Sequence, residues 1–387
     1  MPRKKNPNGS GSIRKKLING KTYFEARYTD PLTHKQRSVS ATTMTECQRK
    51  LREIQAGITR GDYVAPQKLT VAAWLTRWLD SREGIEPTTH ALYERTIRLY
   101  LVPLLGDIQL QSLRRVNCQE FVSALAHDTK RDKPLSAKTI HNAVGVLGKS
   151  LDDAVKSGLI AVNPASGLDM PRVEKRRPAV MESAEQQQFL DAIKASPHRA
   201  IFIVGLHTGM RISEILGLQW KNINLKTGEV LIEQQLNRKA SNNLARELKS
   251  TKTHKSRTIF VPPFVLNTLK AVNLQQKESR LKAGPLWANT EGLVFTREDG
   301  SPVPHNTIAN AFKRLAVKMG RPDLSFHSLR HTFITDEISA GVDVKTVSDM
   351  VGHSDARMTL NVYADATREM KVAAAEQRQK RHEAKNA

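Results

Sequence analysis

The chain has 387 residues, which is enough for two or three domains that each bury a core. Lys and Arg total 61 against 38 Asp and Glu, so the formal net charge is +23 and the pI about 10.1. A surplus of this size indicates a polyanionic partner, first of all nucleic acid. Aromatic residues make up only 5% of the chain, which argues against stacking platforms for single strands and favours the backbone of duplex DNA.

The two cysteines, Cys47 and Cys118, lie far apart and lack the spacing of metal ligands. They are expected to be free thiols in a reducing compartment. No apolar run reaches the length of a membrane span, and the N-terminus has no apolar signal core. These features predict a protein of the bacterial cytoplasm that acts on DNA.

Residues 1–64 are predicted to form a small DNA-binding domain, with residues 1–10 as a basic disordered tail. The expected elements, in chain order, are a hairpin turn at Asn19-Gly20, a strand from Thr22 to Thr29, a turn at Asp30-Pro31, a strand from Lys35 to Ala41, and a helix capped by Thr43 with Glu46 that ends near Ile58. Together with an earlier strand, they predict a three-stranded sheet with one helix. One face of such a sheet can enter the major groove.

Residues 68–168, after a linker at Ala65-Pro66-Gln67, are predicted to form an all-helical domain. The first helix opens at Thr70, and its apolar stripe contains Trp74 and Trp78, which are expected in the core. Further helices are expected from Thr88 to Tyr100 with an end at Pro103 and Gly106, from a cap of Asn117 with Glu120, and from Ser136 to Gly158.

Residues 179–387 follow a charged linker and change to a mixed pattern. The expected elements are a helix capped by Ser183 with Gln186, a buried helix Ala200–Leu206, a helix Arg211–Leu218, strands Glu229–Leu236 and Arg257–Val261 with a strand or turn at Glu247–Thr253 between them, and a mainly helical remainder to Tyr363. The predicted fold class is thus multidomain and mainly α, with small β-sheets.

Two basic residues of the last segment could contact a phosphate ester. Arg211 follows a glycine at a predicted helix start, where unpaired amides and a guanidinium together favour an anion. A surface arginine paired with Glu214 would give the same pattern. Lys252 lies in a predicted hairpin tip, from which a lysine can protonate a leaving oxygen. A solvated basic turn is the alternative, and Lys249 and Lys255 are rival candidates.

Four more candidate groups follow within forty residues: His327 and Arg330 of His327-Ser328-Leu329-Arg330-His331, His353 after Gly352, and Tyr363. A guanidinium can hold a phosphate through two parallel hydrogen bonds. A phenol can attack phosphorus, and imidazoles can move the protons that this attack requires. Each residue alone is more often a core or surface residue, but together they indicate covalent cutting of a phosphodiester.

The order Arg, Lys, His-x-x-Arg, Gly-His, Tyr resembles that of the tyrosine recombinase (phage integrase) family. The resemblance is carried by T-G-M-R-I-S-E-I-L-G-L, T-K-T-H-K-S-R-T-I, H-S-L-R-H-T-F, V-S-D-M-V-G-H-S-D and T-L-N-V-Y-A, and it covers residues 183–364 strongly. By the same resemblance, residues 1–64 are expected to be an arm-type DNA-binding domain. Residues 68–168 are expected to be a helical core-binding domain, and residues 179–387 a catalytic domain with a C-terminal tail.

The resemblance also implies roles for individual residues. Tyr363 is expected to be the nucleophile, which leaves a 3′-phosphotyrosyl link and a free 5′-hydroxyl. Arg211 and Arg330 are expected to hold the non-bridging oxygens, and Lys252 to protonate the departing 5′-oxygen. The segment around Lys252 lacks the proline that often precedes this lysine in the family.

Three further residues complete the implied site. His327 is expected to assist proton transfer at the tyrosine, His353 to hydrogen-bond the phosphate, and Glu214 to support the site. Two arginines and a lysine provide the charge that a metal would otherwise bring, and no Cys/His or carboxylate cluster has metal-ligand spacing. The sequence therefore predicts a reaction that uses no metal and no other cofactor.

The function implied is that of an integrase, which recombines specific DNA sites to integrate, and also excise, a phage genome or other mobile element. Expected partners are attachment-site DNA, three further copies of the chain in a tetramer, an excision directionality factor and a host DNA-bending protein. The alternatives are a Xer-like resolvase of chromosome dimers, a type IB topoisomerase, and a DNA-binding regulator with an inactive site. The tail from Thr367 to Ala387 is either a helix that docks on a neighbouring copy or a frayed basic end.

Overall fold

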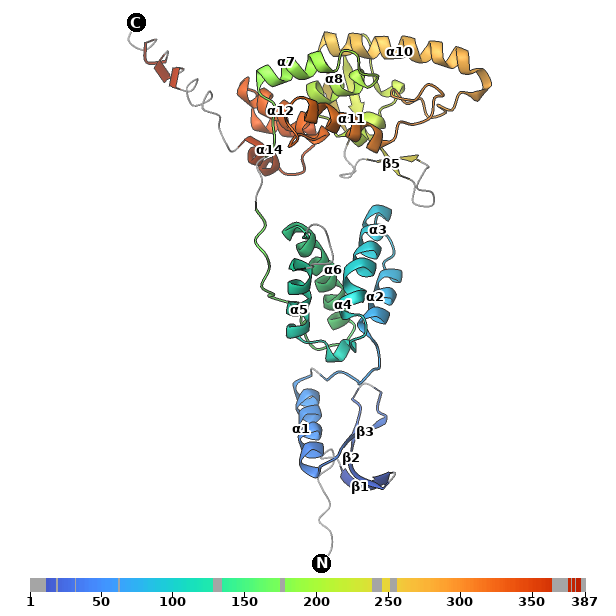
Figure 1. Ribbon diagram of the computed structural model, residues 1–387, viewed down its shortest axis with the longest axis vertical. Helices are drawn as coiled ribbons and strands as arrows, with labels where there is room; N and C mark the ends of the chain where they lie inside the picture. The colour runs from blue at the N-terminus through green and yellow to red at the C-terminus, as the bar shows by residue number, and fades with distance from the viewer. Residues whose placement is uncertain are drawn as a thin grey trace, which may run out of the picture. The chain divides into compact units, whose positions relative to one another are not determined.

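The computed structural model describes residues 12–18, 20–31, 33–61, 63–127, 134–174, 178–238, 246–250, 256–363, 375–376, 378–379 and 381–383. The expected basic tail at residues 1–10 and the segment with Lys252 lie outside these residues. The chain divides into two compact units, residues 1–174 and residues 175–387 (Figure 1). The first unit contains two separate apolar cores, one within residues 13–63 and one within residues 69–170. The fold is mainly helical with small antiparallel sheets, which confirms the predicted class.

The N-terminal module, residues 12–63, is a three-stranded antiparallel sheet with one helix. Its elements are β1 (Ser12–Ile18), β2 (Lys21–Thr29), β3 (Gln36–Ala41) and α1 (Met44–Arg60). Ala26 and Tyr28 of β2 pack with Cys47 and Leu51 of α1, so the alternate residues of β2 lie on the opposite face of the sheet. Thr43 caps α1 as expected, since its side chain accepts a hydrogen bond from the Glu46 amide at 3.3 Å.

The helical domain, residues 64–174, packs around the predicted tryptophans. Trp74 and Trp78 are buried, and Thr70 and Ser136 cap helices as expected. Its elements are α2 (Val71–Asp80), α3 (Pro87–Thr96), the π-helical turn η1 (Ile97–Leu101), α4 (Val102–Leu105), the 3₁₀ turn η2 (Leu110–Ser112), α5 (Arg115–Ala126) and α6 (Ala137–Lys156).

Two predicted boundaries in this domain need correction. The helical path ends at Gly106, the C-cap of α4, as expected, but it does not stop at Pro103, because the π-turn η1 leads into α4 and places Pro103 in its first turn, where a missing N–H costs little. Helix α5 begins at Arg115 rather than at Asn117. Asn117 instead accepts a hydrogen bond from the Arg114 amide at 3.0 Å, in the third position of the helix.

The C-terminal unit surrounds a larger apolar core with helices and two small sheets. Strand β4 pairs with β7, and β5 with β6, so the expected strand Glu229–Leu236 is divided between two sheets. Helix α7 is capped by Glu182 with Glu185, not by Ser183 with Gln186. The elements are α7 (Ser183–Ala192), α8 (Arg199–Thr208), α9 (Ile212–Leu216), η3 (Trp220–Asn222), β4 (Glu229–Ile232), β5 (Gln234–Arg238), β6 (Arg246–Ser250), β7 (Arg257–Phe260), α10 (Pro263–Ala283), η4 (Gly284–Leu286), α11 (His305–Lys318), α12 (Phe326–Ser339), α13 (Val344–Val351) and α14 (Ala356–Tyr363).

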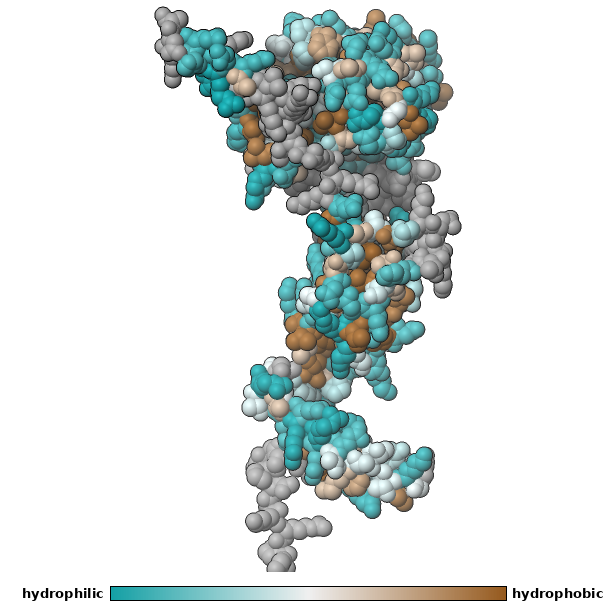
Figure 2. Space-filling view, turned by 60° about the vertical axis from the view of Figure 1, so that its left-hand side comes forward, coloured by the Kyte–Doolittle hydropathy of each residue, from teal (hydrophilic) through white to brown (hydrophobic). Residues whose placement is uncertain are grey.

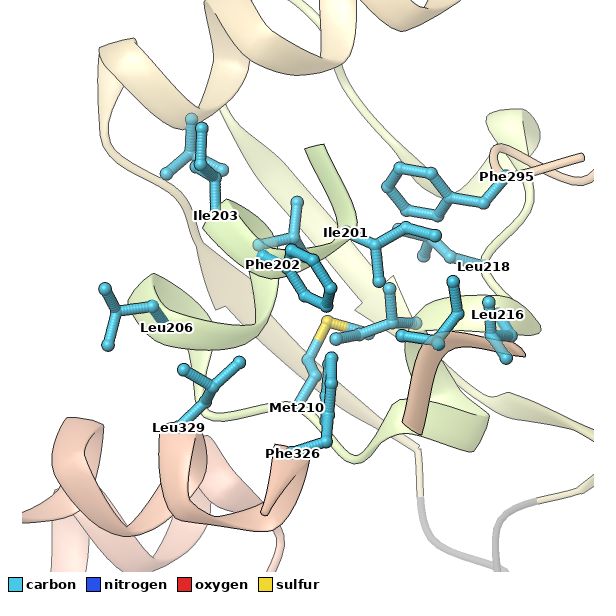
Figure 3. Packing of buried hydrophobic residues seen from close by; sticks show 14 of the residues in the cluster. Ile201, Phe202, Ile203, Leu206, Met210, Leu216, Leu218, Phe295, Phe326 and Leu329 are labelled. Atoms are coloured by element: carbon cyan, nitrogen blue, oxygen red, sulfur yellow. The ribbon is translucent and has the colours of Figure 1, made fainter. Parts of the chain in front are cut away.

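Helix α8, which is buried from Ile201 to Leu206, lies at the centre of this core. Phe202 of α8 lies against Phe326 of α12, with ring centroids 6.2 Å apart, and Met210 follows in the same cluster (Figure 3). This packing fixes the segment after α8 against the start of α12. The outer surface of the C-terminal unit is mostly hydrophilic in the view of Figure 2, with apolar residues in small patches. Within the described ranges, no helix has the length and apolar character that crossing a membrane requires.

Candidate active site

Arg211 lies at the N-cap of α9, directly after the sharp turn that ends α8. Gly209 forms this turn in the left-handed region, at φ 59°, and a Cβ there would lie 2.5 Å from Cδ1 of Phe333. Glycine is therefore needed both for the backbone conformation and for the close approach of α12. The turn leaves the Arg211 side chain partly exposed, with Nη2 donating to the carbonyl oxygen of Gly352 at 3.1 Å.

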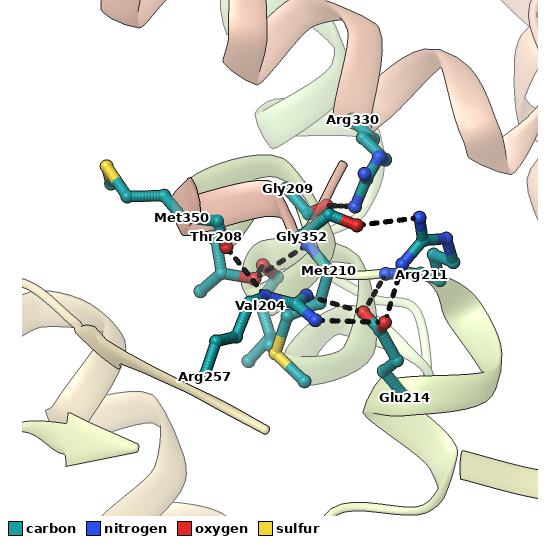
Figure 4. Close-up of polar contacts among 10 residues, drawn as sticks. All are labelled: Val204, Thr208, Gly209, Met210, Arg211, Glu214, Arg257, Arg330, Met350 and Gly352. Carbon is teal, nitrogen blue, oxygen red and sulfur yellow. Dashed lines mark hydrogen bonds and ion pairs between the residues drawn. The ribbon is translucent and has the colours of Figure 1, made fainter. Parts of the chain in front are cut away.

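Glu214 is buried, and each of its carboxylate oxygens accepts two hydrogen bonds (Figure 4). Oε1 accepts from Nη1 of Arg211 at 2.8 Å and from Nη1 of Arg257 at 3.1 Å. Oε2 accepts from the Arg211 amide at 2.9 Å and from Nη2 of Arg257 at 2.7 Å. Burial alone would raise the pKa of Glu214, but hydrogen bonds and charge from Arg257 and Arg211 lower it overall. The buried carboxylate of Glu214 thus holds both the backbone and the guanidinium of Arg211 in position.

Arg330 is 1% exposed and lies one turn into α12. Its Nη1 donates to the carbonyl oxygen of Gly209 at 2.8 Å, whereas Nε and Nη2 have no hydrogen-bond partner among the described residues. Burial lowers the pKa of Arg330 to about 9, and the charge of Arg211 acts in the same direction. A buried cation with unpaired donors beside a second cation is costly unless an anion binds there.

Two histidines of α12 lie next to each other. The rings of His327 and His331 meet edge to face, with centroids 4.6 Å apart. His327 is exposed at the surface, but surrounding protein atoms and the charges of Arg330 and Arg211 lower the pKa of its imidazole. Burial also lowers the pKa of His331, to about 4, and its Nδ1 has no partner among the described residues.

His353 directly follows the C-terminal cap of α13. Gly352 ends α13 in the left-handed region, at φ 69°, and the next residue is half-buried. Nδ1 of His353 lies 2.8 Å from the hydroxyl of the buried Thr359 in α14. Burial and the nearby charges of Arg330 and Arg211 lower the pKa of His353 to about 4. The ring is therefore neutral at pH 7, and a hydrogen-bonded partner from α14 holds it in place.

The structure thus brings Arg211, Arg330 and His353 into one neighbourhood, from three separate segments of the chain. Figure 4 shows both guanidinium groups beside the carbonyl groups of Gly209 and Gly352. His327 belongs to the same neighbourhood, because both arginines act on its pKa. Sequence reasoning missed Arg257, which pairs with Glu214. Its only signal was its place in the T-K-T-H-K-S-R-T-I stretch.

The remaining two predicted catalytic residues are Tyr363 and Lys252. Tyr363 is the last residue of α14, the helix whose Thr359 contacts His353. Lys252 lies outside the described residues, in the segment that precedes β7. A surface pocket of about 500 Å³ is lined by Ser256, Arg257, Lys345, Asp349, Gly352, His353 and Ser354. Among the side chains that the structure describes, no group of three or more His, Cys, Asp or Glu could hold a metal ion.

Comparison with known proteins identifies relatives of this chain. The family description "Phage integrase family" matches residues 179–370, and "Phage integrase, N-terminal SAM-like domain" matches residues 70–126. A "Tyrosine recombinase XerC-like" protein of Caldanaerobacter subterraneus subsp. tengcongensis is 27% identical over 92% of this chain and 96% of its own length. An "Integrase" of Streptomyces ambofaciens is 27% identical over 84% of this chain and 83% of its own.

Solved structures show the same fold. The integrase of the transposon Tn1549, in complex with transposon right end DNA, has a TM-score of 0.67 and 24% identity over 80% of this chain and 99% of that one. A λ integrase tetramer bound to a Holliday junction has a TM-score of 0.58 and 16% identity over 90% of this chain and 94% of that one. From its site, its fold and these relatives, the chain belongs to the phage integrase family of tyrosine recombinases, enzymes that break and rejoin DNA strands.

Proposed function

We propose that this recombinase is an integrase that joins specific DNA sites through a 3′-phosphotyrosyl intermediate, and so integrates and excises a phage genome or other mobile element. The observation that carries the proposal is that the guanidinium groups of Arg211 and Arg330 lie in the same neighbourhood. Arg330 has buried donors without partners among the described residues, and Arg211 is held by Glu214 with part of its guanidinium exposed. Two convergent guanidinium groups match the two non-bridging oxygens of a phosphodiester.

In the proposed reaction, the phenol oxygen of Tyr363 attacks phosphorus, and its proton leaves with the assistance of His327. A tyrosine oxygen–phosphorus bond forms as the bond from phosphorus to the 5′-oxygen breaks. Lys252 gives its proton to that oxygen, which leaves as a free hydroxyl. The reverse steps with a hydroxyl of another strand rejoin the DNA. The covalent link retains the energy of the broken ester, so no ATP is required.

The other polar residues of the site are proposed to stabilise the charge that builds on phosphorus. Arg211 and Arg330 would hold the non-bridging oxygens, with Glu214 supporting Arg211. His353, which is neutral at pH 7 and hydrogen-bonded to Thr359 through Nδ1, has Nε2 left to contact a phosphate oxygen. Arg211, Arg330 and Lys252 would supply the positive charge that a metal ion brings to the phosphate in many nucleases, so we propose a metal-free reaction.

A Xer-like resolvase is the second candidate, and the name of the Caldanaerobacter relative favours it. We prefer an integrase because of the N-terminal module, a basic three-stranded sheet with its own apolar core. We propose that residues 1–64 bind arm-type sites, that residues 68–168 bind core sites, and that residues 179–387 perform the chemistry. The relatives that were solved on DNA, as a dimer or tetramer, support a tetramer on two DNA sites.

Accessory proteins and the cellular location complete the proposal. Integration and excision join different pairs of sites, so the direction of the reaction requires a further protein, which we propose to be an excision directionality factor. A host DNA-bending protein would bring arm-type and core sites of one DNA within reach of a single chain. We place the reaction in the cytoplasm of a bacterial cell, and the bacterial origin of the relatives supports this. The C-terminal tail is proposed to dock on a neighbouring copy.

The test of this function is covalent trapping on a nicked suicide substrate, from which the short cleaved strand diffuses away. The intact chain is expected to form a DNA adduct that survives denaturation, and Tyr363→Phe to form none while binding the same DNA, since phosphate contacts come mainly from basic groups. Tyr93→Phe is the matched control, because among the described residues the hydroxyl of Tyr93 accepts one hydrogen bond, from Lys149 at 3.2 Å in the helical domain. An adduct with Tyr363→Phe would contradict the assignment.

A further inference from the structure

Arg257 connects three segments that carry residues of the proposed site. It is the first residue of β7, five positions after Lys252, and its side chain is 12% exposed. Nη1 and Nη2 donate to the two oxygens of Glu214 at 3.1 Å and 2.7 Å, and Nε donates to the carbonyl oxygen of Met350 at 2.8 Å. One side chain therefore ties the start of β7 to α9 and to the last turn of α13 (Figure 4).

The turn that carries His353 is also shaped around Arg257. A Cβ at Gly352 would lie 2.7 Å from Nη1 and 3.0 Å from Cζ of Arg257, so the backbone of Gly352 rests directly against the guanidinium. The carbonyl of the same glycine accepts a hydrogen bond from Arg211. Moving Arg257 would consequently disturb Gly352, the position of His353 that follows it, and one contact of Arg211.

The charges at this point give Arg257 a second task. Glu214 carries one negative charge, and two arginines share it: Arg211, which has 32% of its side chain exposed, and the largely buried Arg257. Without Arg257, the carboxylate would have only Arg211 as a cation in direct contact among the described residues. The negative charge of Glu214 would then offset the positive charge of Arg211. It would also draw the Arg211 guanidinium away from the exposed side where a phosphate could bind.

Arg257 already uses each of its guanidinium nitrogens within the protein, so it is not placed to bind a substrate. Each of its three guanidinium nitrogens donates to a protein acceptor, and the bidentate contact with Glu214 fixes the plane of the group. In this respect it differs from Arg330, whose Nε and Nη2 have no partner among the described residues. Arg330 therefore has donors available for an anion, whereas Arg257 uses its donors to hold other groups of the protein in place.

We propose that Arg257 is a positioning residue for strand cleavage, which neutralises Glu214 so that the charge of Arg211 remains available to the scissile phosphate, and which fixes the Gly352-His353 turn and the strand that follows Lys252. The inference rests on the proposed phosphotyrosine chemistry, but it concerns a residue outside the six predicted catalytic positions, which are Arg211, Lys252, His327, Arg330, His353 and Tyr363. It makes a specific prediction: loss of Arg257 should resemble a partial loss of Arg211.

The experiment uses the full-length chain and measures the rate of covalent adduct formation in a single turnover on the suicide substrate. The variants are Arg257→Met, which keeps the length but removes charge and donors, and Arg257→Lys, which keeps the charge without the fork. A second substrate has a methyl group in place of one non-bridging oxygen at the scissile position, and its phosphorus centre is therefore uncharged. A residue that acts by charge neutralisation at the phosphate matters less on this substrate.

The matched control is Arg321→Met in the same unit. Arg321 also joins two carboxylates, those of Glu185 and Asp323, and its Nη2 lies near the Val180 carbonyl oxygen, but none of these groups contacts the site. This substitution is expected to slow cleavage of either substrate by no more than about twofold, because Arg321 and its partners do not contact the residues of the site.

With Arg257→Met we expect cleavage of the ordinary substrate to fall about a hundredfold with DNA affinity nearly unchanged, because small displacements of positioned groups have effects of this size. The loss should shrink to about tenfold or less on the uncharged substrate, and Arg257→Lys should recover part of the rate. In a chain that already carries Glu214→Gln, the further change Arg257→Met should cost much less, because no negative charge is left to neutralise.

Three results would overturn the inference. Cleavage by Arg257→Met at the rate of the intact chain would show that the residue is dispensable. An equal loss on both substrates, with no recovery in Arg257→Lys, would show a purely structural role. If the losses of cleavage rate in Glu214→Gln and Arg257→Met simply added up in the double variant, the two residues would not be coupled. If Arg257→Met does not fold, the same comparison is made with Arg257→Lys. Failure of the intact chain to form any adduct would instead reject the proposed function.

Discussion

Arg330 donates a hydrogen bond from Nη1 to the carbonyl oxygen of Gly209 at 2.8 Å, although the two residues are 121 positions apart in the chain. The contact joins the first turns of α12 to the turn before Arg211. Because Gly209 is in the left-handed conformation and has no side chain, its carbonyl can face Arg330 while Phe333 packs against the same turn. The relative position of the two arginines is therefore fixed by backbone and packing together.

Replacing Arg330 by alanine is expected to abolish most of the cleavage while DNA binding remains. Loss of one positioned donor to a developing oxyanion costs about 100- to 1,000-fold in rate. The rest of the basic surface continues to bind phosphates, so the affinity at moderate salt should change far less. The rate of adduct formation and a binding titration on the same DNA measure the two effects.

Arg330→Lys gives the finer comparison at this position. Lysine keeps the charge but has no rigid fork with which to reach both Gly209 and a phosphate oxygen, so the rate should recover only in part. If Arg330→Ala cleaved as fast as the intact chain, the proposed phosphate site would be in the wrong place. A loss of binding equal to the loss of cleavage would make Arg330 a binding residue only.

The pH dependence of stability follows from the two histidines with strongly lowered pKa values. His331 and His353 have pKa values of about 4 in the folded chain and about 6.5 in the unfolded chain, the ordinary value of a solvated imidazole. Between pH 6.5 and 4 the unfolded chain therefore binds protons that the folded chain does not. The stability of the C-terminal unit should be complete above pH 6.5 and decrease as the pH falls toward 4.

Hydrogen exchange of the α8 amides measures this effect in the C-terminal unit alone. The variant His331→Phe has no proton to gain on unfolding, so its stability should vary less with pH than that of the intact chain. The same substitution at His90 of α3, in the other unit, is the control and should leave the α8 profile unchanged. An unaltered acid dependence in His331→Phe would mean that His331 is not kept neutral by burial.

Much of this fold could be predicted from the sequence because it depends on local patterns. Thr43, Thr70 and Ser136 cap their helices through side-chain oxygens that any such residue can supply, and the apolar stripe with Trp74 and Trp78 is buried. Errors arise where the local signal competes with a tertiary one. Pro103 should end a helix, but a π-turn before it lets the helical path continue.

The candidate site divides in the same way. The order of Arg211, His327, Arg330, His353 and Tyr363 follows a family pattern, so these positions could be predicted as a group. The partner that holds Glu214 could not, because Arg257 is 43 positions away and its role depends on how β7 packs beside α9. The contact between His327 and His331 was also missed, although adjacent turns of one helix bring together residues that are four apart in sequence.

Chelation of divalent metal ions is expected to leave strand cleavage intact. The charge that develops on the phosphate would be balanced by Arg211, Arg330 and Lys252 instead of by a metal ion. Adduct formation in excess EDTA should therefore proceed at a rate within about twofold of that in magnesium, after ionic strength is matched. Loss of the adduct in EDTA, with recovery on adding magnesium, would contradict the metal-free scheme.

Deletion of residues 1–64 tests the proposed division of labour between the domains. The N-terminal module has its own core around Ala26, Tyr28 and Leu51, and β1 and β2 carry basic residues on the sheet face opposite α1, such as Arg14 and Lys16. A tethered module of this kind adds affinity through effective concentration and takes no part in the chemistry. The shortened chain should still form the adduct on a core-site suicide substrate at a measurable rate.

Recombination between full attachment sites should nevertheless fall strongly in the shortened chain, because no module remains to bridge separate arm sequences. Binding to full-site DNA should also depend less steeply on salt, since fewer phosphates are neutralised and fewer counterions are released. The control is the intact chain with Arg49→Gln and Glu53→Gln, which removes an exposed pair from α1, on the helix side of the module, without altering net charge. If the shortened chain recombined full sites as well as the intact one, the arm-binding role would be wrong, and the resolvase would become the better account of this recombinase.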